Sequence, residues 1–135
     1  MSNVFADQYR FMRACDQHTD RYDADQYAMY LRLIQEETNE LMDAVLASDR
    51  VEQLDALIDI LVVTVGAIHS LGANGEGAWN EVMRTNFAKI DRTTGKVRKR
   101  EDGKVLKPEG WRPPDLQPFV IKQFDDRLRT DWLEP

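Results

Sequence analysis

Helix-breaking residues are almost absent from the first hundred positions of this chain. Among its 135 residues the first glycine is Gly66 and the first proline is Pro108. Glycine and proline disfavour helix more than any other residues, so their scarcity favours long helices. The sequence predicts four of them, over residues 4–17, 24–47, 50–71 and 76–90.

Cysteine and long apolar runs are also scarce. The single cysteine, Cys15, cannot form an internal disulfide. The most apolar run, residues 60–68, is far shorter than the roughly 20 residues that a bilayer-spanning helix needs. The N-terminus lacks a basic region followed by an apolar one. We therefore expect a cytoplasmic protein without a membrane segment. The net charge of −6 argues against nucleic acid as a partner.

Beyond position 90 the composition changes to glycine, proline and basic residues. The dipeptide Asp102-Gly103 indicates a tight hairpin turn. The predicted fold is all-α, an antiparallel bundle of four main helices with an extended C-terminal tail that contains a small β-hairpin. We expect one domain over residues 1–116, with the basic hairpin tail at 90–116. Residues 117–135 form a C-terminal extension, in which 118–130 are a candidate short helix.

Acidic side chains concentrate on the second and third predicted helices. Between positions 31 and 60 there are eight acidic residues and two basic ones. At about 100° per residue, Glu37 falls within the apolar arc of its helix, and Glu36 and Glu40 lie at the edge of that arc. The third helix is apolar nearly all round except for Asp55 and Asp59, which are one turn apart. We expect this helix at the centre of the bundle, with its aspartates facing the glutamates.

Carboxylates that converge in a partly dry site must either take up protons or bind a cation. A set of oxygen donors without histidine or cysteine suits Mg²⁺ or Mn²⁺ and argues against zinc. The alternative is that these are ordinary solvated surface acids, which is the usual role of any single Glu or Asp. Two adjacent helices break the apolar pattern in the same way, and this favours a shared site.

The fourth helix and the tail carry the opposite charge. Asn86 and Lys89 lie in the apolar stripe of the fourth helix, where a lysine can hold a phosphate and an asparagine can add a directional hydrogen bond. Alternatively, Lys89 only extends its charge to solvent at the helix end. Residues 89–107 hold eight cations and three acids, a balance that suits recruitment of a polyanion. A nucleic-acid patch is the competing interpretation, but interleaved aromatics are lacking and only Trp111 is near.

Several stretches together resemble a known superfamily. Residues 36–40 (EETNE) and 55–66 resemble the EExxE and ExxD metal motifs of the all-α nucleotide pyrophosphohydrolases, which include the MazG-like enzymes. Residues 81–89, 100–108 and 113–115 resemble more closely its phosphoribosyl-ATP pyrophosphohydrolase-like, Cof-like branch. The resemblance implies a Mg²⁺-bound helical bundle that forms a homodimer or homotetramer. It also implies hydrolysis of a nucleoside triphosphate between its α and β phosphates, giving a monophosphate and pyrophosphate.

Carried over by position, the resemblance also assigns residues. It implies that Glu37, Glu40 and Asp59 bind the metal, and that Glu36 holds a further metal ion or the attacking water. A glutamate of the Glu36/Glu37 pair would accept the proton. Ala56 stands where an acid is expected, so Asp55 is the replacement ligand. The residues implied to contact the substrate are Arg84, Asn86, Lys89 and Lys107.

The sequence leaves the substrate and the class of function open. Phosphoribosyl-ATP or an alarmone could be hydrolysed at the same metal cluster. A different class of function is a non-catalytic helical adaptor whose basic tail binds an anionic partner.

Overall fold

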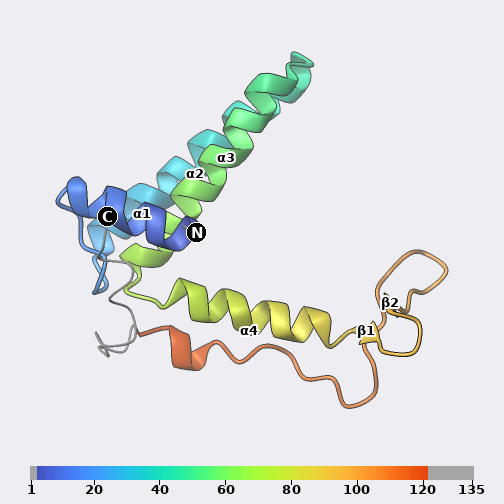
Figure 1. Ribbon diagram of the computed structural model, residues 1–135. Coiled ribbons are helices and arrows are strands. Elements are labelled where there is room, and N and C mark those ends of the chain that lie inside the picture. The colour runs from blue at the N-terminus through green and yellow to red at the C-terminus, as the bar shows by residue number, and fades with distance from the viewer. Residues whose placement is uncertain (1–2, 122–135) are drawn as a thin grey trace. The chain divides into compact units, whose positions relative to one another are not determined.

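The computed structural model describes residues 3–121, and these fall into two compact units. The first unit runs to Gly75 and takes up the chain again at Phe119, while the second comprises Glu76–Pro118. Figure 1 shows the elements in chain order. They are the helices α1 (Val4–Ala14), α2 (Ala24–Leu46), α3 (Arg50–Ser70) and α4 (Gly75–Phe87), the strands β1 (Ile90–Asp91) and β2 (Lys96–Val97), and the 3-10 turn η1 (Gln117–Phe119).

The predicted all-α class, with four helices and a small antiparallel hairpin after them, is confirmed. The sequence grouped all four helices in one domain over 1–116, with an extension after it. That division into domains stays a prediction. By its contacts, α4 groups with the hairpin and the tail in the unit Glu76–Pro118. The bundle of the first unit is therefore built from α1, α2 and α3.

Side-chain caps fix where the first three helices begin. The Asn3 side chain accepts a hydrogen bond from the Ala6 amide at 2.9 Å, and the Asp23 side chain accepts one from the Gln26 amide at 3.0 Å. Asp49 accepts from two amides at the start of α3, each at 3.1 Å. Just before it, Ser48 has a φ of 54°, which reverses the chain direction. This short capped link allows α2 and α3 to pack side by side as an antiparallel pair.

Small residues bring α2 and α3 close together. Ala44 on α2 is 7% exposed and Ala56 on α3 is 3% exposed. Farther along the pair, the Tyr30 ring packs over Gly66, and Tyr30 forms a buried cluster with Met12 of α1 and neighbouring side chains. The core of the first unit therefore lies at the α1 end of the α2–α3 pair.

The hairpin of the second unit lies earlier in the chain than its predicted turn. Its strands pair Ile90 with Val97, and the turn between them is held by Asp91, whose carbonyl accepts from the Gly95 amide at 2.8 Å. The predicted turn at Asp102-Gly103 also forms, with φ of 88° at Gly103, but it closes only a single isolated bridge. The Asp91 side chain also accepts a hydrogen bond from the Thr93 amide at 2.8 Å within the earlier turn.

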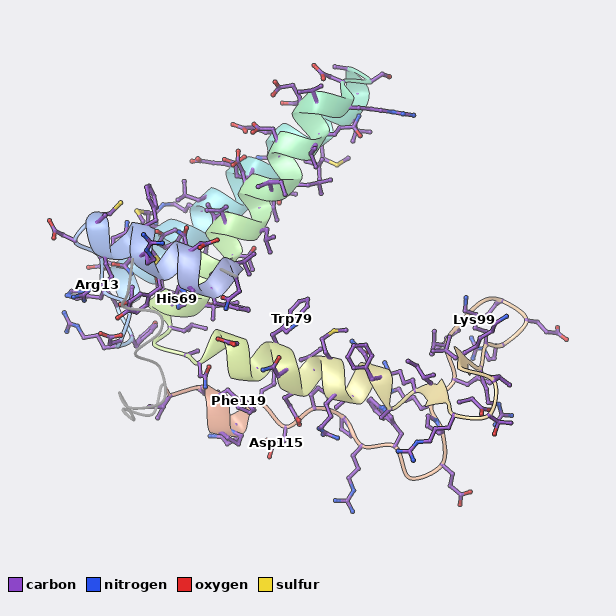
Figure 2. The ribbon with its side chains drawn as sticks, viewed as in Figure 1. Arg13, His69, Trp79, Lys99, Asp115 and Phe119 are labelled. Atoms are coloured by element: carbon purple, nitrogen blue, oxygen red, sulfur yellow. The ribbon has the colours of Figure 1, made fainter. Side chains whose placement is uncertain are left out.

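The tail after the hairpin returns along α4. The indole N–H of Trp111 donates to the Thr85 carbonyl at 2.7 Å, and the Asp115 amide donates to the Glu81 carboxylate at 2.9 Å. Figure 2 shows Asp115 beside the helix. These two contacts attach residues 108–118 to α4.

Two further expectations concern the chain end and membranes. Of the candidate helix at 118–130, only the start is described, and Gln117–Phe119 forms a single 3-10 turn; residues 122–130 lie outside the described part of the chain.

Within residues 3–121, no single helix has both the length and the hydropathy to cross a membrane. Only α3 and α4 taken as a pair meet that test, on length and composition alone.

Replacing Gly66 with alanine should destabilise the fold. A Cβ at this position would lie 2.6 Å from Cδ1 and 2.7 Å from Cζ of Tyr30. Such overpacking costs about 1–3 kcal/mol, whereas helix propensity alone predicts that Gly→Ala stabilises by about 1 kcal/mol. Urea unfolding of the Gly66→Ala protein measures whether the free energy of unfolding falls or rises. The same loss is expected in a Tyr30→Phe background, which keeps the ring but removes the hydroxyl; a stabilised Gly66→Ala protein would contradict the packing.

Candidate active site

Glu37 lies among apolar residues on the inner face of α2. That face carries the buried residues Tyr30 and Ala44, and the Glu37 side chain is itself half-buried. Its Oε2 atom is buried and has no hydrogen-bond partner within the described residues. A carboxylate oxygen in this position has lost its water without gaining a donor, which is unfavourable for its charged form.

Aspartates of α3 approach Glu37 from the facing helix. Asp59 is half-buried and Asp55, one turn earlier, is exposed. Ala56 is buried at the contact between the helices, so an acid at that position would lie inside the helix contact. Asp55 instead lies beside this contact, where a carboxylate keeps access to solvent.

The charges of these residues act on one another. Burial, a hydrogen bond with the Glu40 carboxyl, and the charges of Glu40, Asp59 and Asp55 raise the pKa of Glu37 to about 7. Burial and the charges of Asp55 and Glu40 also raise the pKa of Asp59. The structure therefore brings Glu37, Glu40, Asp55 and Asp59 into a single electrostatic group, which we call the carboxylate cluster.

Glu36 lies outside the carboxylate cluster. Its side chain is exposed, and it is not among the residues that shift the pKa of Glu37 or Asp59. The helical geometry explains this position, because Glu36 is rotated by about 100° from Glu37 around α2. Its carboxylate remains accessible to water.

A hollow of about 410 Å³ extends the cluster toward the α2–α3 link. Its floor consists of alanines, and its acidic lining residues are Glu40, Asp43, Asp49, Glu52 and Asp55. From the sequence, no site role was assigned to Asp43, Asp49 or Glu52. Asp49 also caps the start of α3. For Asp43 and Glu52 the signal was their spacing of three residues, about one helical turn, from Glu40 and Asp55.

The donor set fits a hard divalent cation in its chemistry. All the donors are carboxylate oxygens, and Glu37 Oε2 lacks a partner. Within residues 3–121, however, no three Asp, Glu, His or Cys side chains are already arranged to hold a metal ion. A bound cation would therefore have to draw the carboxylates closer together.

The four candidate substrate-contacting residues all lie in the second unit. Arg84 is paired with Glu81 through two hydrogen bonds of 2.7 and 3.1 Å, and together with the Asp115 amide it lowers the pKa of Glu81 to about 2. Arg84 is thus already neutralised. Lys89 Nζ donates to Asn86 Oδ1 at 3.1 Å.

Trp111 contacts two of the four candidates, Lys89 and Lys107. Lys89 Nζ lies 5.2 Å and Lys107 Nζ 4.8 Å from the centroid of its ring, which are cation–π contacts. Sequence reasoning noted Trp111 but gave it no role. The signal was present, since Trp111 lies four residues after Lys107, the last cation of the basic segment.

Comparison with known proteins gives one family match. No curated protein matches the chain significantly. The model of the family described as phosphoribosyl-ATP pyrophosphohydrolase matches residues 7–86. This range includes every member of the carboxylate cluster and more than half of the chain. The chain therefore belongs to the phosphoribosyl-ATP pyrophosphohydrolase family, within the MazG-like all-α pyrophosphohydrolases.

Proposed function

We propose that this chain is a Mg²⁺-dependent hydrolase of nucleoside triphosphates. It would cleave between the α and β phosphates, releasing a nucleoside monophosphate and pyrophosphate, and so control or cleanse the nucleotide pool. One observation carries the proposal: two half-buried carboxylates, Glu37 and Asp59, lie on adjacent helices inside the region matched by a pyrophosphohydrolase family. Helix packing places both acids where their charge needs compensation.

The carboxylate cluster would hold the cation. Glu37, Glu40, Asp55 and Asp59 supply only oxygen donors, which suit Mg²⁺ and also accept Mn²⁺. When bound, such an ion would polarise phosphate oxygens and offset the charge that develops on the leaving pyrophosphate. Ala44 and Ala56, which are both buried, line the hollow beside the cluster.

One carboxylate of the Glu36/Glu37 pair would accept the proton of the attacking water. Glu36 is the candidate we favour for this role, because its side chain is exposed to water and directly precedes Glu37 in the chain. Glu37 is then left to hold the cation.

The second unit supplies donors for phosphate oxygens. Lys89 and Lys107 are held by Trp111, and Asn86 has an amide that can donate to an anion. Arg84 would have to exchange its Glu81 partner before binding phosphate. Phosphoribosyl-ATP is the second candidate substrate, and the description of the matching family favours it. It contains the same bond between α and β phosphates.

We also propose that the chain assembles as a homodimer or homotetramer. Four apolar side chains recur at helical spacing on the outer side of α3. Their exposed fractions are 62% for Leu54, 51% for Leu57, 50% for Ile58 and 43% for Leu61. The sequence placed α3 at the centre of a bundle, but its outer stripe is uncovered in the single chain. A continuous apolar stripe of this kind is typical of a protein–protein interface.

Neutralising the cluster should abolish hydrolysis without unfolding the protein. Glu37→Gln and Asp59→Asn keep the side-chain shape but lose the charge that holds a cation, so we expect a loss of about 100-fold or more in pyrophosphate release. The measurement is pyrophosphate release from a panel of nucleoside triphosphates, deoxynucleoside triphosphates and phosphoribosyl-ATP, with and without Mg²⁺. Asp25→Asn, an exposed change on the same helix, is the control. Full activity of both cluster variants, with unchanged circular dichroism, would refute the assignment.

Without divalent cations, thermal stability should fall as the pH rises from about 5 to about 7. Glu37 has a pKa of about 7 in the folded chain against an ordinary 4.5, so the folded state binds the proton more tightly than the unfolded state does. That stability is present below the ordinary pKa and is lost as the pH approaches the folded value. Melting curves in EDTA should show this slope, and Glu37→Gln should flatten it. At pH 7, Mg²⁺ should raise the melting temperature of the wild type more than that of Glu37→Gln. Equal slopes in both proteins would contradict the burial of this charge.

A charge on the outer stripe of α3 should dissociate the oligomer. In sedimentation velocity, Leu61→Lys should shift the protein toward the monomer, because a buried lysine at an apolar interface is unfavourable. Leu116→Lys is the matched control, since Leu116 is 40% exposed and Leu61 is 43% exposed, and it should leave the assembly intact. A wild-type chain that sediments as a monomer, or equal dissociation by both changes, would count against the α3 interface.

A further inference from the structure

A cavity in the second unit collects unpaired positive charge. Its volume is about 470 Å³, within the usual range for small-ligand sites. Four cationic residues line it, Lys89, Arg92, Arg98 and Lys107, together with the single acid Asp91. Two of the four, Arg92 and Arg98, have no role in the proposed hydrolysis.

These four cations have no carboxylate partners in the described chain. The ion pairs found in this unit join Arg84 to Glu81 and Arg100 to Asp102. One oxygen of Asp91 accepts from the Thr93 amide at 2.8 Å. Like charges gathered around one cavity without paired anions repel one another, and a bound anion would relieve this repulsion.

Two of the cations are held in place by Trp111. The Trp111 ring is itself attached to α4 by its hydrogen bond to Thr85. Because both ammonium groups contact this one ring, they lie at most about 10 Å apart. Lys89 uses one of its three donors on Asn86 and keeps two for a ligand. The cavity is therefore partly organised for an anion before any ligand binds.

The other residues that line the cavity indicate which kind of anion it could bind. Apolar side chains, including Ile90 and Leu106, form part of the wall. None of the residues that line the cavity is aromatic, and the nearby Trp111 ring already contacts two of the lining ammonium groups. The lining itself therefore offers no ring on which bases could stack. Guanidinium groups such as those of Arg92 and Arg98 match phosphate oxygens in a two-pronged geometry. These features favour a short phosphate chain over a nucleic-acid strand.

We propose that this cavity binds the chain of a small oligophosphate, without needing a divalent cation. Pyrophosphate and the triphosphate group of a nucleotide share this chemistry. The choice of ligand rests on the proposed function, since substrate and product of that reaction both carry such a chain. Binding itself depends only on residues of the second unit.

Isothermal titration of the full chain in EDTA tests the proposal. The titrants are sodium tripolyphosphate, pyrophosphate and a nucleoside triphosphate. We expect binding that weakens with salt, and a loss of about tenfold or more for the double change Arg92→Ala/Arg98→Ala, as expected when charged hydrogen bonds are removed. Arg100→Ala is the matched control, because Arg100 is paired with Asp102, and it should change the affinity less than about twofold. Comparable affinities for tripolyphosphate and the nucleotide would identify the phosphate chain as the group that is bound.

Three outcomes would overturn the proposal. They are no binding of any oligophosphate in EDTA, equal weakening by Arg100→Ala and the double change, and tighter binding of a single-stranded oligonucleotide than of tripolyphosphate. Glu37→Gln separates this proposal from the proposed hydrolysis. It should leave binding in EDTA unchanged, and loss of that binding would place the anion elsewhere. A wild type that binds tripolyphosphate but hydrolyses no nucleotide would refute the hydrolysis alone.

Discussion

Repulsion among carboxylates held between two packed helices is the constraint on which the rest of the site depends. Packing of α2 on α3 through small residues such as Ala44 and Ala56 fixes the backbone. This packing holds Glu37 on the inner face of α2, with or without a positive charge nearby to balance the carboxylate. Apolar contacts along the helix pair stabilise this arrangement. Repulsion between the carboxylates destabilises it. On the proposed function, a cation bound at this site would relieve both the repulsion and the unpaired carboxylate oxygen.

The two units divide the charge of the chain between them. The first unit holds the carboxylate cluster and the acidic hollow, and the second holds the basic cavity organised by Trp111. Hydrolysis of a phosphate chain needs a cation that polarises the reacting phosphate and donors that hold the rest of the anion. Membership of a pyrophosphohydrolase family is consistent with both requirements. On the proposed function, each unit supplies one of them from its own residues.

Much of the first unit could be predicted from sequence, since its determinants are local. The absence of breakers before Gly66 sets the long helices, and Asp23 and Asp49 mark where two of them begin. The inward position of Glu37 follows from counting residues around α2. The exposed outer stripe of α3 could not be foreseen, because an all-round apolar helix has the same sequence pattern whether its own chain or another covers it.

The second unit was less predictable because its contacts are distant in sequence and involve backbone atoms. Trp111 binds a carbonyl 26 residues away at Thr85, and no side-chain pattern indicates such a partner. Arg84 and Glu81 are only three residues apart. Their ion pair still could not be predicted, because oppositely charged residues at this helical spacing often do not form one. The hairpin was expected at Asp102-Gly103, whereas the regular strands pair Ile90 with Val97 and Asp91 with Lys96, across an earlier turn.

The most direct test of the central claim is paramagnetic broadening by Mn²⁺ in the amide spectrum of the labelled full chain. Substoichiometric Mn²⁺ should first broaden the resonances around Glu37, Glu40, Asp55 and Asp59, and excess Mg²⁺ should restore them. Broadening spread evenly over the surface acids, or centred away from these four residues, would show that the carboxylates between α2 and α3 do not share a cation.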